Sequence, residues 1–274
     1  IDENFNINID SDYLKRIITD GTYKIKFKSP FKLFNIPFNL NGEYKRIPSS
    51  FVSFGNPSIP KDIQGLKTGL KMIFLNNKLT INIGYTDNND NVNDYKLSTT
   101  SSKGNNLGIN LNFNKLPSLS YSRKFLNRND NSGLVNNSTT THTITPAYKL
   151  KINDMNFGFN NNFVIMNYND DLINNINNNF QQVSFSSSLS LSTKQLIINS
   201  GLGISKNKPK DPTKGETQFI ALSSKMSYKP TNKKLSSYIG YNRIVGENND
   251  INNTINNQKN SFKVGAQYKI NEYS

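Results

Sequence analysis

Apolar and polar side chains alternate along most of this chain with a period of two residues. Leu70, Met72 and Phe74, for example, occupy even-numbered positions, and Lys71 lies between the first two of them. A period of two is typical of a β-strand whose two faces meet different surroundings. Helical periodicity is nearly absent, so the pattern predicts an all-β protein.

About 14 segments carry this alternation, and most of them are longer than the strands of soluble proteins. About 10 residues at about 3.3 Å each, tilted by about 40°, rise roughly 25 Å, which is the height of an apolar membrane band. The predicted strands cover residues 5–9, 23–28, 34–45, 66–74, 79–85, 95–113, 118–126, 140–152, 155–168, 183–192, 195–205, 217–229, 234–245 and 260–270.

The connections between these segments alternate in length. Tight links at 76–78, 115–117, 153–154, 193–194 and 231–233 take turns with long polar ones at 46–64, 87–94, 127–139, 169–180, 206–216 and 246–258. Such asymmetry is typical of a transmembrane β-barrel, which must close on itself because backbone polar groups find no partners in lipid. We therefore predict a single-domain (1–274) transmembrane antiparallel up-and-down meander β-barrel, with short periplasmic turns and long extracellular loops.

Two other interpretations share part of this pattern. A soluble β-sandwich also alternates, with its apolar side chains facing a core, and Asn-rich runs can indicate disorder. Strand length, loop asymmetry and the confinement of most Asn runs to loops favour the barrel. Aromatic residues near the long loops would form its interfacial girdle; they are Tyr44, Tyr85, Tyr95, Phe125, Tyr241 and Phe262. Pro37 and Pro146 fall inside predicted strands, where we expect bulges or local breaks because proline donates no hydrogen bond.

Composition removes several kinds of chemistry. The chain has no Cys and one His, so disulfides, thiolate metal sites and multi-histidine sites are excluded. No apolar run approaches 18 residues, and the chain starts at Ile1 without a leader, so we expect a mature chain or a fragment without membrane helices. His142 is the one candidate base near neutral pH, but Thr143 and Ile144 follow it where a lipase-like His-x-Ser motif would place serine. We expect no catalytic, cofactor or metal site, and no enzyme.

The net charge of +14 comes from 33 Lys and Arg against 19 Asp and Glu, and the acids fall mostly in loops. Lysines, in contrast, occupy the polar parity of many strands and would point into a lumen, because a charge facing lipid costs about 2–4 kcal/mol at the midplane. No aromatic stacking face is interleaved with them, which argues against nucleic-acid binding. The predicted pore-lining residues are Lys24, Lys26, Lys45, Lys67, Lys71, Lys149, Lys151, Lys225, Lys263, Lys269 and the acid Glu43.

The pattern over about 250 residues resembles bacterial outer-membrane β-barrel proteins of the porin-like class. The stretch from Tyr44 to Lys67, with Ser53-Phe54-Gly55-Asn56-Pro57, is similar to uncharacterised barrels of Bacteroidetes-like bacteria. The chain departs from that class in ending at Ser274 rather than at an aromatic residue. The resemblance implies a bacterial outer membrane, with the lipid bilayer and lipopolysaccharide as partners. A mitochondrial outer membrane is the alternative, because mitochondrial porins have a similar length.

Two functions follow from these features. A basic lumen would make the barrel a passive or weakly anion-selective pore for small anionic solutes. Alternatively, the barrel is plugged by its own side chains and is a structural or interaction protein, whose Asn-rich loops bind a partner, polysaccharide or lipopolysaccharide.

Overall fold

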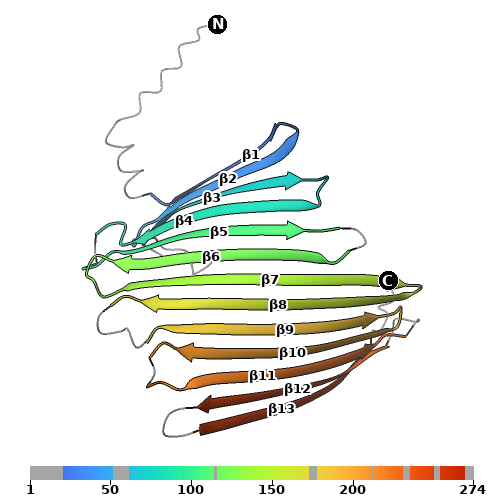
Figure 1. The fold of residues 1–274 in the computed structure, drawn as a ribbon. Helices are drawn as coiled ribbons and strands as arrows, with labels where there is room; N and C mark the ends of the chain where they lie inside the picture. The colour runs from blue at the N-terminus through green and yellow to red at the C-terminus, as the bar shows by residue number, and fades with distance from the viewer. Residues whose placement is uncertain are drawn as a thin grey trace.

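The computed structural model describes residues 21–51, 62–94, 96–113, 116–172, 178–211, 213–230, 235–249 and 254–268. These residues form one antiparallel sheet of thirteen strands, and each strand pairs with its neighbours in the chain (Figure 1). The strands are β1 (Tyr23–Leu33), β2 (Ile36–Ile47), β3 (Ile63–Phe74), β4 (Leu79–Asp90), β5 (Thr100–Leu111), β6 (Ser118–Asp130), β7 (Asn136–Ile152), β8 (Met155–Asp170), β9 (Phe180–Ser192), β10 (Leu196–Pro209), β11 (Glu216–Tyr228), β12 (Leu235–Asn249) and β13 (Thr254–Tyr268).

The all-β up-and-down meander predicted from the alternation is confirmed, and the alternative of two stacked sheets is wrong for the described residues. Within those residues, no helix has the length and apolar character needed to cross a membrane. The fourteenth predicted strand, over residues 5–9, lies outside the described residues.

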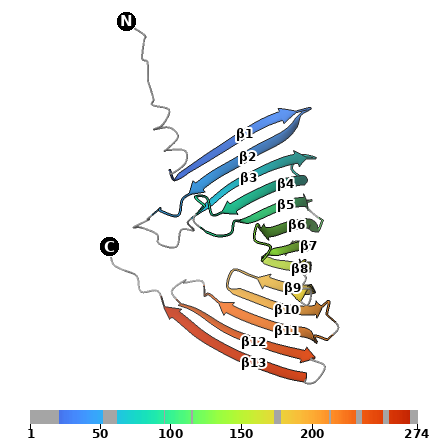
Figure 2. The ribbon, with the colours of Figure 1, turned by 90° about the vertical axis from the view of Figure 1, so that its left-hand side faces the viewer.

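The sheet is strongly curved. In Figure 2 the middle strands lie farthest to the right, and both outer strands sweep back towards the left. Among the described residues, β1 pairs only with β2, and β13 pairs only with β12. The described sheet is therefore an open, curved sheet whose two free edges are β1 and β13.

The two ends of the sheet differ in their connections. At one end, here called the turn end, the links are residues 34–35, 75–78, 112–117, 153–154, 193–195 and 229–234. At the other, the loop end, they are residues 48–62, 91–99, 131–135, 171–179, 210–215 and 250–253. Asn35, Asn76, Asn77 and Asn153 have φ of 62°, 52°, 69° and 51° in the tight turns. Asn tolerates this left-handed conformation better than most residues, so these turns are encoded locally.

One cross-strand row shows how the strands fit together. Residues paired across antiparallel strands share a face, and this row is apolar in twelve consecutive strands. This apolar row is Phe31, Phe38, Met72, Ile81, Ile109, Tyr121, Ile144, Phe163, Phe185, Ile204, Ile220 and Val245. We call the face that carries it the apolar face, and the opposite face, which carries Asn39, Lys71, Asn82 and Ser122, the polar face.

The apolar row runs obliquely to the ends of the sheet. It begins two positions from the turn end of β1, at Phe31 before Leu33, and reaches β12 ten positions from its turn end, at Val245 after Leu235. Most of this offset arises between β6, where Tyr121 lies three positions from Ser118 at the turn end, and β7, where Ile144 lies eight positions from Ile152. Closing a sheet into a barrel requires a stagger of this kind, because tilted strands must meet in register around the circumference.

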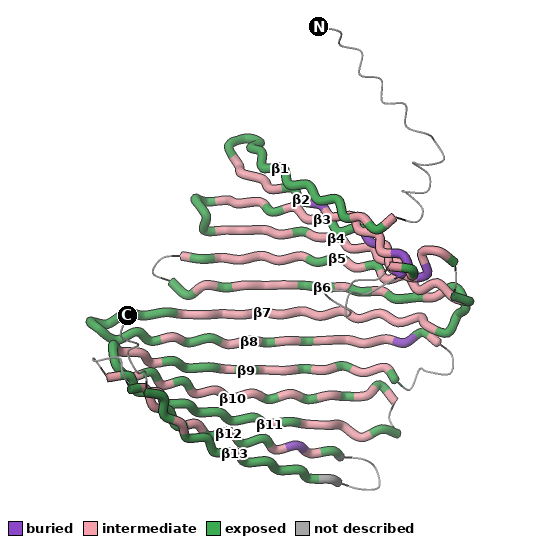
Figure 3. The backbone as a smooth tube through the Cα atoms, turned by 180° about the vertical axis from the view of Figure 1, so that it is seen from behind, coloured by how far each residue is buried: buried purple, intermediate pink, exposed green. Residues whose placement is uncertain are grey.

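The apolar face has no cover. No hydrophobic side chain among the described residues is buried, and exposed or intermediate positions run along all thirteen strands (Figure 3). Phe31, Ile144 and Phe163 of the apolar row are 44%, 44% and 45% exposed. The described sheet therefore lacks the packed interior that stabilises a domain in water.

The strands differ from their predicted ranges mainly at the loop end. Strand β7 begins at Asn136 rather than 140, β10 continues to Pro209, and β12 continues to Asn249, because backbone pairing extends beyond the apolar positions. Two predicted ranges are wrong. Phe34 lies in the first turn, with φ of 49° and an exposure of 88%, and the strand predicted from residue 95 begins only at Thr100.

The two prolines behave differently. Pro146 pairs with Leu119 of β6, but the β7–β8 ladder is interrupted between Ile144 and Ala147 and resumes in the same register. This is the local break that we predicted, because proline has no N–H to donate. Pro37 pairs with Lys32 at the turn end of β2, before the β2–β3 ladder starts at Phe38.

Gly265 provides a test of cross-strand packing. A Cβ at this position would lie 2.4 Å from Cε1 of Tyr238, so the ring of Tyr238 on β12 must cover the glycine. We expect Gly265→Ala to lower the free energy of unfolding by about 1–3 kcal/mol through overpacking. A urea titration followed by circular dichroism measures this. The control is Gly203→Ala, whose Cβ would lie 3.8 Å from that of Ala221, an ordinary contact; equal losses in both variants would contradict the packing of Tyr238.

Candidate functional site

Each strand carries its apolar residues next to the turn end. On the apolar face, the mostly apolar stretches are residues 23–33, 36–44, 66–74, 79–85, 107–111, 119–125, 144–152, 155–165, 183–191, 196–204, 220–228, 235–245 and 262–268. Most of these stretches have nine to eleven residues. In a strand tilted by about 40°, such a length spans roughly 25 Å. We call this continuous belt the apolar band.

Aromatic residues mark the edge of the apolar band that faces the loop end. Tyr44, Tyr85 and Phe125 are the last apolar residues on that face of β2, β4 and β6. The hydroxyl of Tyr85 donates to Oδ2 of Asp87 at 3.2 Å, and that of Tyr241 donates to Oδ1 of Asn260 at 3.3 Å. Aromatic rings that lie on the apolar face and hydroxyls that bond to polar residues are typical of an interfacial girdle. Tyr95, also predicted for this girdle, lies outside the described residues.

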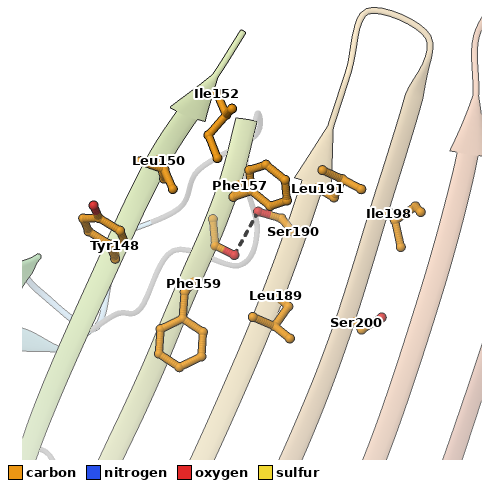
Figure 4. A pocket seen from close by; sticks show the side chains of 11 residues that line it. Tyr148, Leu150, Ile152, Phe157, Phe159, Leu189, Ser190, Leu191, Ile198 and Ser200 are labelled. Atoms are coloured by element: carbon orange, nitrogen blue, oxygen red, sulfur yellow. Dashed lines mark hydrogen bonds between the residues drawn. The ribbon is translucent and has the colours of Figure 1, made fainter. Parts of the chain in front are cut away.

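The turn-end part of the apolar band is visible at close range in Figure 4. Side chains from β7 to β10 surround a shallow apolar depression between neighbouring strands. Its lining includes Tyr148, Leu150, Phe157, Phe159, Leu189 and Ile198. Gaps between these large side chains can be filled by an apolar hydrocarbon chain, whereas water finds no hydrogen-bond partner among their apolar atoms.

Seven basic side chains among the described residues lie on the apolar face: Arg46, Lys103, Arg123, His142, Lys206, Lys208 and Arg243. Arg123 pairs across β6 and β7 with His142, and Arg243 lies on β12. The hydrogen bond of His142 joins its Nδ1 to the hydroxyl of Tyr121 at 3.0 Å, and the two rings are 6.2 Å apart. Among the described residues, the hydrogen-bond partner of His142 is thus a phenol rather than a serine or a carboxylate, so this geometry gives no support to a nucleophilic site.

The predicted lining residues share the polar face. Register places Lys24, Lys26, Lys45, Lys67, Lys71, Lys149, Lys151, Lys225, Lys263 and Glu43 on it. Lys269 lies outside the described residues. Lys32, Arg128 and Lys259 also belong to this face, which their parity could have indicated had the strands been extended far enough.

These cations are unevenly distributed around the sheet. Among the described strands they form three groups, the largest on β1 to β3, a second on β6 and β7 (Lys124, Arg128, Lys149 and Lys151), and a third on β11 and β13 (Lys225, Lys259 and Lys263). In the described part of the chain, the polar faces of β4, β5, β8, β9 and β10 carry no Lys or Arg, and Ser, Thr, Asn, Gln and Gly fill most of their positions. We call these cations the basic wall; its largest group borders the free edge at β1.

Glu43 is enclosed by this wall. Its carboxylate lies 3.0 Å from Nζ of Lys24 and 3.8 Å from Nζ of Lys26, and its side chain is 25% exposed. Lys67 stands directly opposite it on β3. One acid shared by three lysines leaves a net positive field on this part of the polar face.

The polar face is also the more sheltered face over the loop-end half of β8 to β10. Val183 on the apolar face is 46% exposed, whereas Gln182 and Ser184 on either side of it are only partly exposed. Both bond to Oγ of Ser205 at 2.9 Å. Polar side chains that are less exposed than their apolar neighbours indicate a concave polar face, because side chains converge on the inside of a curved sheet.

At the loop end, a hydrogen-bonded network joins Asp62 to the 91–99 connection. Asp62 is 5% exposed; it accepts a hydrogen bond from the N–H of Val92 at 2.8 Å and lies 3.0 Å from Nζ of Lys96. Lys96 also lies 3.2 Å from Oδ2 of Asp90. The hydrogen bond to Asp62 is the main reason that the pKa of Lys96 is raised above its ordinary value of 10.5. The 91–99 connection is therefore held by side-chain hydrogen bonds and ion pairs rather than by secondary structure.

We expect Asp62→Asn to loosen the 91–99 connection, because the amide can still accept from Val92 but no longer attracts Lys96. The raised pKa means that the ion pair contributes fully below about pH 10.5 and is lost as pH rises through the folded value. Amide hydrogen exchange at Val92 should therefore be faster in the variant at pH 8. If wild type and variant exchange alike at pH 8, the ion pair does not hold the loop.

No protein-family model matches this sequence, and a search of curated proteins finds no match. Among solved structures, one similar chain is described as the crystal structure of the beta domain of the Bordetella autotransporter BrkA. The two chains are 10% identical with a TM-score of 0.37, and the match covers 91% of this chain and 98% of that chain.

Proposed function

We propose that this chain is an integral β-barrel of a bacterial outer membrane and that its basic polar face lines a passive pore favouring small anions. The observation that carries the proposal is the apolar row, which crosses twelve strands on an uncovered face. In water this surface would be an aggregation liability. In a bilayer the same surface contacts lipid, and the hydrogen bonds of the ladder satisfy the backbone. A mitochondrial outer membrane would satisfy the same physics and is the alternative location.

Closure of the sheet is part of this proposal. The stagger of the strands and the curvature in Figure 2 support it, because both bring the edges β1 and β13 towards one another. Unpaired backbone groups along these edges would cost several kcal/mol each in lipid. A closed barrel would place the polar face inside, with the largest group of the basic wall beside the seam.

The preference for anions follows from the charge on the polar face. Within the described part of the apolar band, Glu43 is the only acid on the opposite face, against eight of the ten predicted lysines. A low-dielectric wall focuses their field and raises the local concentration of anions. The effect is screened over about 8 Å at physiological ionic strength, so it should grow as salt is diluted.

Neighbouring residues of β8 test the orientation of the two faces. Phe159 is 41% exposed on the apolar face, and Asn160 follows it on the polar face. We expect Phe159→Lys to destabilise the folded protein in lipid vesicles by about 2–4 kcal/mol, because it places a charge in hydrocarbon. Asn160→Lys, the matched control, should cost much less. Equal tolerance of both changes, measured by urea titration in vesicles, would refute the lipid contact of the apolar face.

Charge reversal at Lys67 and Lys71 tests the pore. We expect the wild type in a planar bilayer with a KCl gradient to show a reversal potential on the anion-selective side. Lys67→Glu with Lys71→Glu should shift this potential towards cation selectivity, since four units of charge change on β3. A wild type that prefers cations would overturn the electrostatic argument. A folded, inserted wild type without conductance would favour the plugged barrel with ligand-binding loops.

A further inference from the structure

A small hollow lies on the polar face near the β13 edge of the sheet. It is lined by residues of β9 to β13, among them Asn199, Ser223, Lys225, Tyr238, Asn242 and Lys263. Every side chain in this set carries a hydrogen-bond donor, and two of them are cations. Aspartate and glutamate are absent from its lining residues.

The register explains why the hollow exists. Lys225 on β11 pairs with Gly240 on β12, and Gly240 pairs with Lys263 on β13. The two lysines therefore flank a residue without a side chain, and their Cα atoms are two strand spacings apart, about 10 Å. A Cβ on Gly240 would meet only ordinary contacts at 3.7 Å and 4.0 Å, both to backbone oxygens, so the space above this glycine is open.

The neighbouring positions give the hollow a floor and a wall. Gly201 on β10 pairs with Ser223, whose Oγ leans to within 2.8 Å of where a Cβ of Gly201 would stand. Tyr238 lies over Gly265, and Nζ of Lys225 is 5.1 Å from the centre of its ring. This cation–π contact restrains Lys225 without neutralising its charge.

Two ammonium groups around an open gap, with amide and hydroxyl donors beside them and no carboxylate among the lining residues, are suited to a small oxyanion. Charge-assisted hydrogen bonds to phosphate oxygens are stronger than neutral ones, and lysine can rotate its three donors towards such a group. Lys24 and Lys26 differ from this pair, because Glu43 already occupies the space between them.

We propose that Lys225 and Lys263, with Asn199 and Asn242, form a binding site for a phosphate-like oxyanion on the polar face. The position of this site inside a lumen rests on the proposed function. The site adds to that function a class of solute that the pore would bind transiently. Binding itself requires only the folded sheet. It can therefore be measured without conduction.

The test is a titration of the purified full chain, folded in detergent, with inorganic phosphate at low ionic strength, followed by calorimetry. We expect Lys225→Gln with Lys263→Gln to weaken phosphate binding by about tenfold or more, as loss of charged hydrogen bonds predicts. Lys67→Gln with Lys71→Gln removes the same net charge from the same face and should change the affinity by only about twofold, through the general field. Circular dichroism of each variant should show the same strand content as the wild type.

A second variant separates the site from its charge. Gly240→Val retains both lysines, suits a strand and fills the gap, so it should abolish binding without altering net charge. Equal weakening in the two double-lysine variants, unchanged binding in Gly240→Val, or no phosphate binding by the wild type would each overturn the site. Binding in detergent without conductance in bilayers would instead retain the site and reject the pore.

Discussion

The continuous hydrogen-bonded ladder from β1 to β13 is the constraint on which the rest of this structure depends. Each of the twelve strand pairs keeps a single register along its full length. The face on which a residue lies is therefore fixed by its position in the ladder. A slip of one residue in any pair would move all following apolar residues to the polar face. Because the described sheet buries no hydrophobic side chain, packing cannot correct such a slip locally. Register is instead set by the short Asn-containing turns and by cross-strand contacts such as Phe163 with Phe185, whose ring centres are 4.7 Å apart.

The two faces of the ladder differ in the size of their side chains. The apolar face carries large side chains with few gaps in its row, whereas the polar face alternates Asn and Ser with glycine. On that face the Oδ1 of Asn106 lies 2.2 Å from where a Cβ of Gly84 would stand, so the glycine makes room for its neighbour's amide. Small residues are needed where side chains converge, on the inside of a curved sheet. The distribution of glycine and asparagine on the polar face thus favours curvature of the sheet, as the turns do.

Much of this fold could be predicted from the sequence because the apolar face obeys a strict parity. Leu70, Ile83, Leu111, Phe159, Leu191 and Ile239 share one face, as their alternation indicated. Parity failed where the environment of a strand changes along its length. In β5 the apolar positions end at Leu107, and the ladder continues through Asn105 to Thr100 with side chains that carry no hydropathy signal. Phe34 misled for the opposite reason, because it has the parity of Ile36 yet occupies a turn. The hydropathy pattern therefore locates the apolar band rather than the strand.

The candidate sites were predictable to different degrees for the same reason. The basic character of the polar face follows from parity alone, and all nine of the predicted lysines that the structure describes share this face with Glu43. The hollow between Lys225 and Lys263 could not be found this way, because these residues are 38 positions apart in sequence and meet only through the β11–β12–β13 register. Its glycine, Gly240, has no signal of its own in a strand pattern. A side chain there would join the two lysines into an ordinary polar surface, and its absence makes a place for a third group.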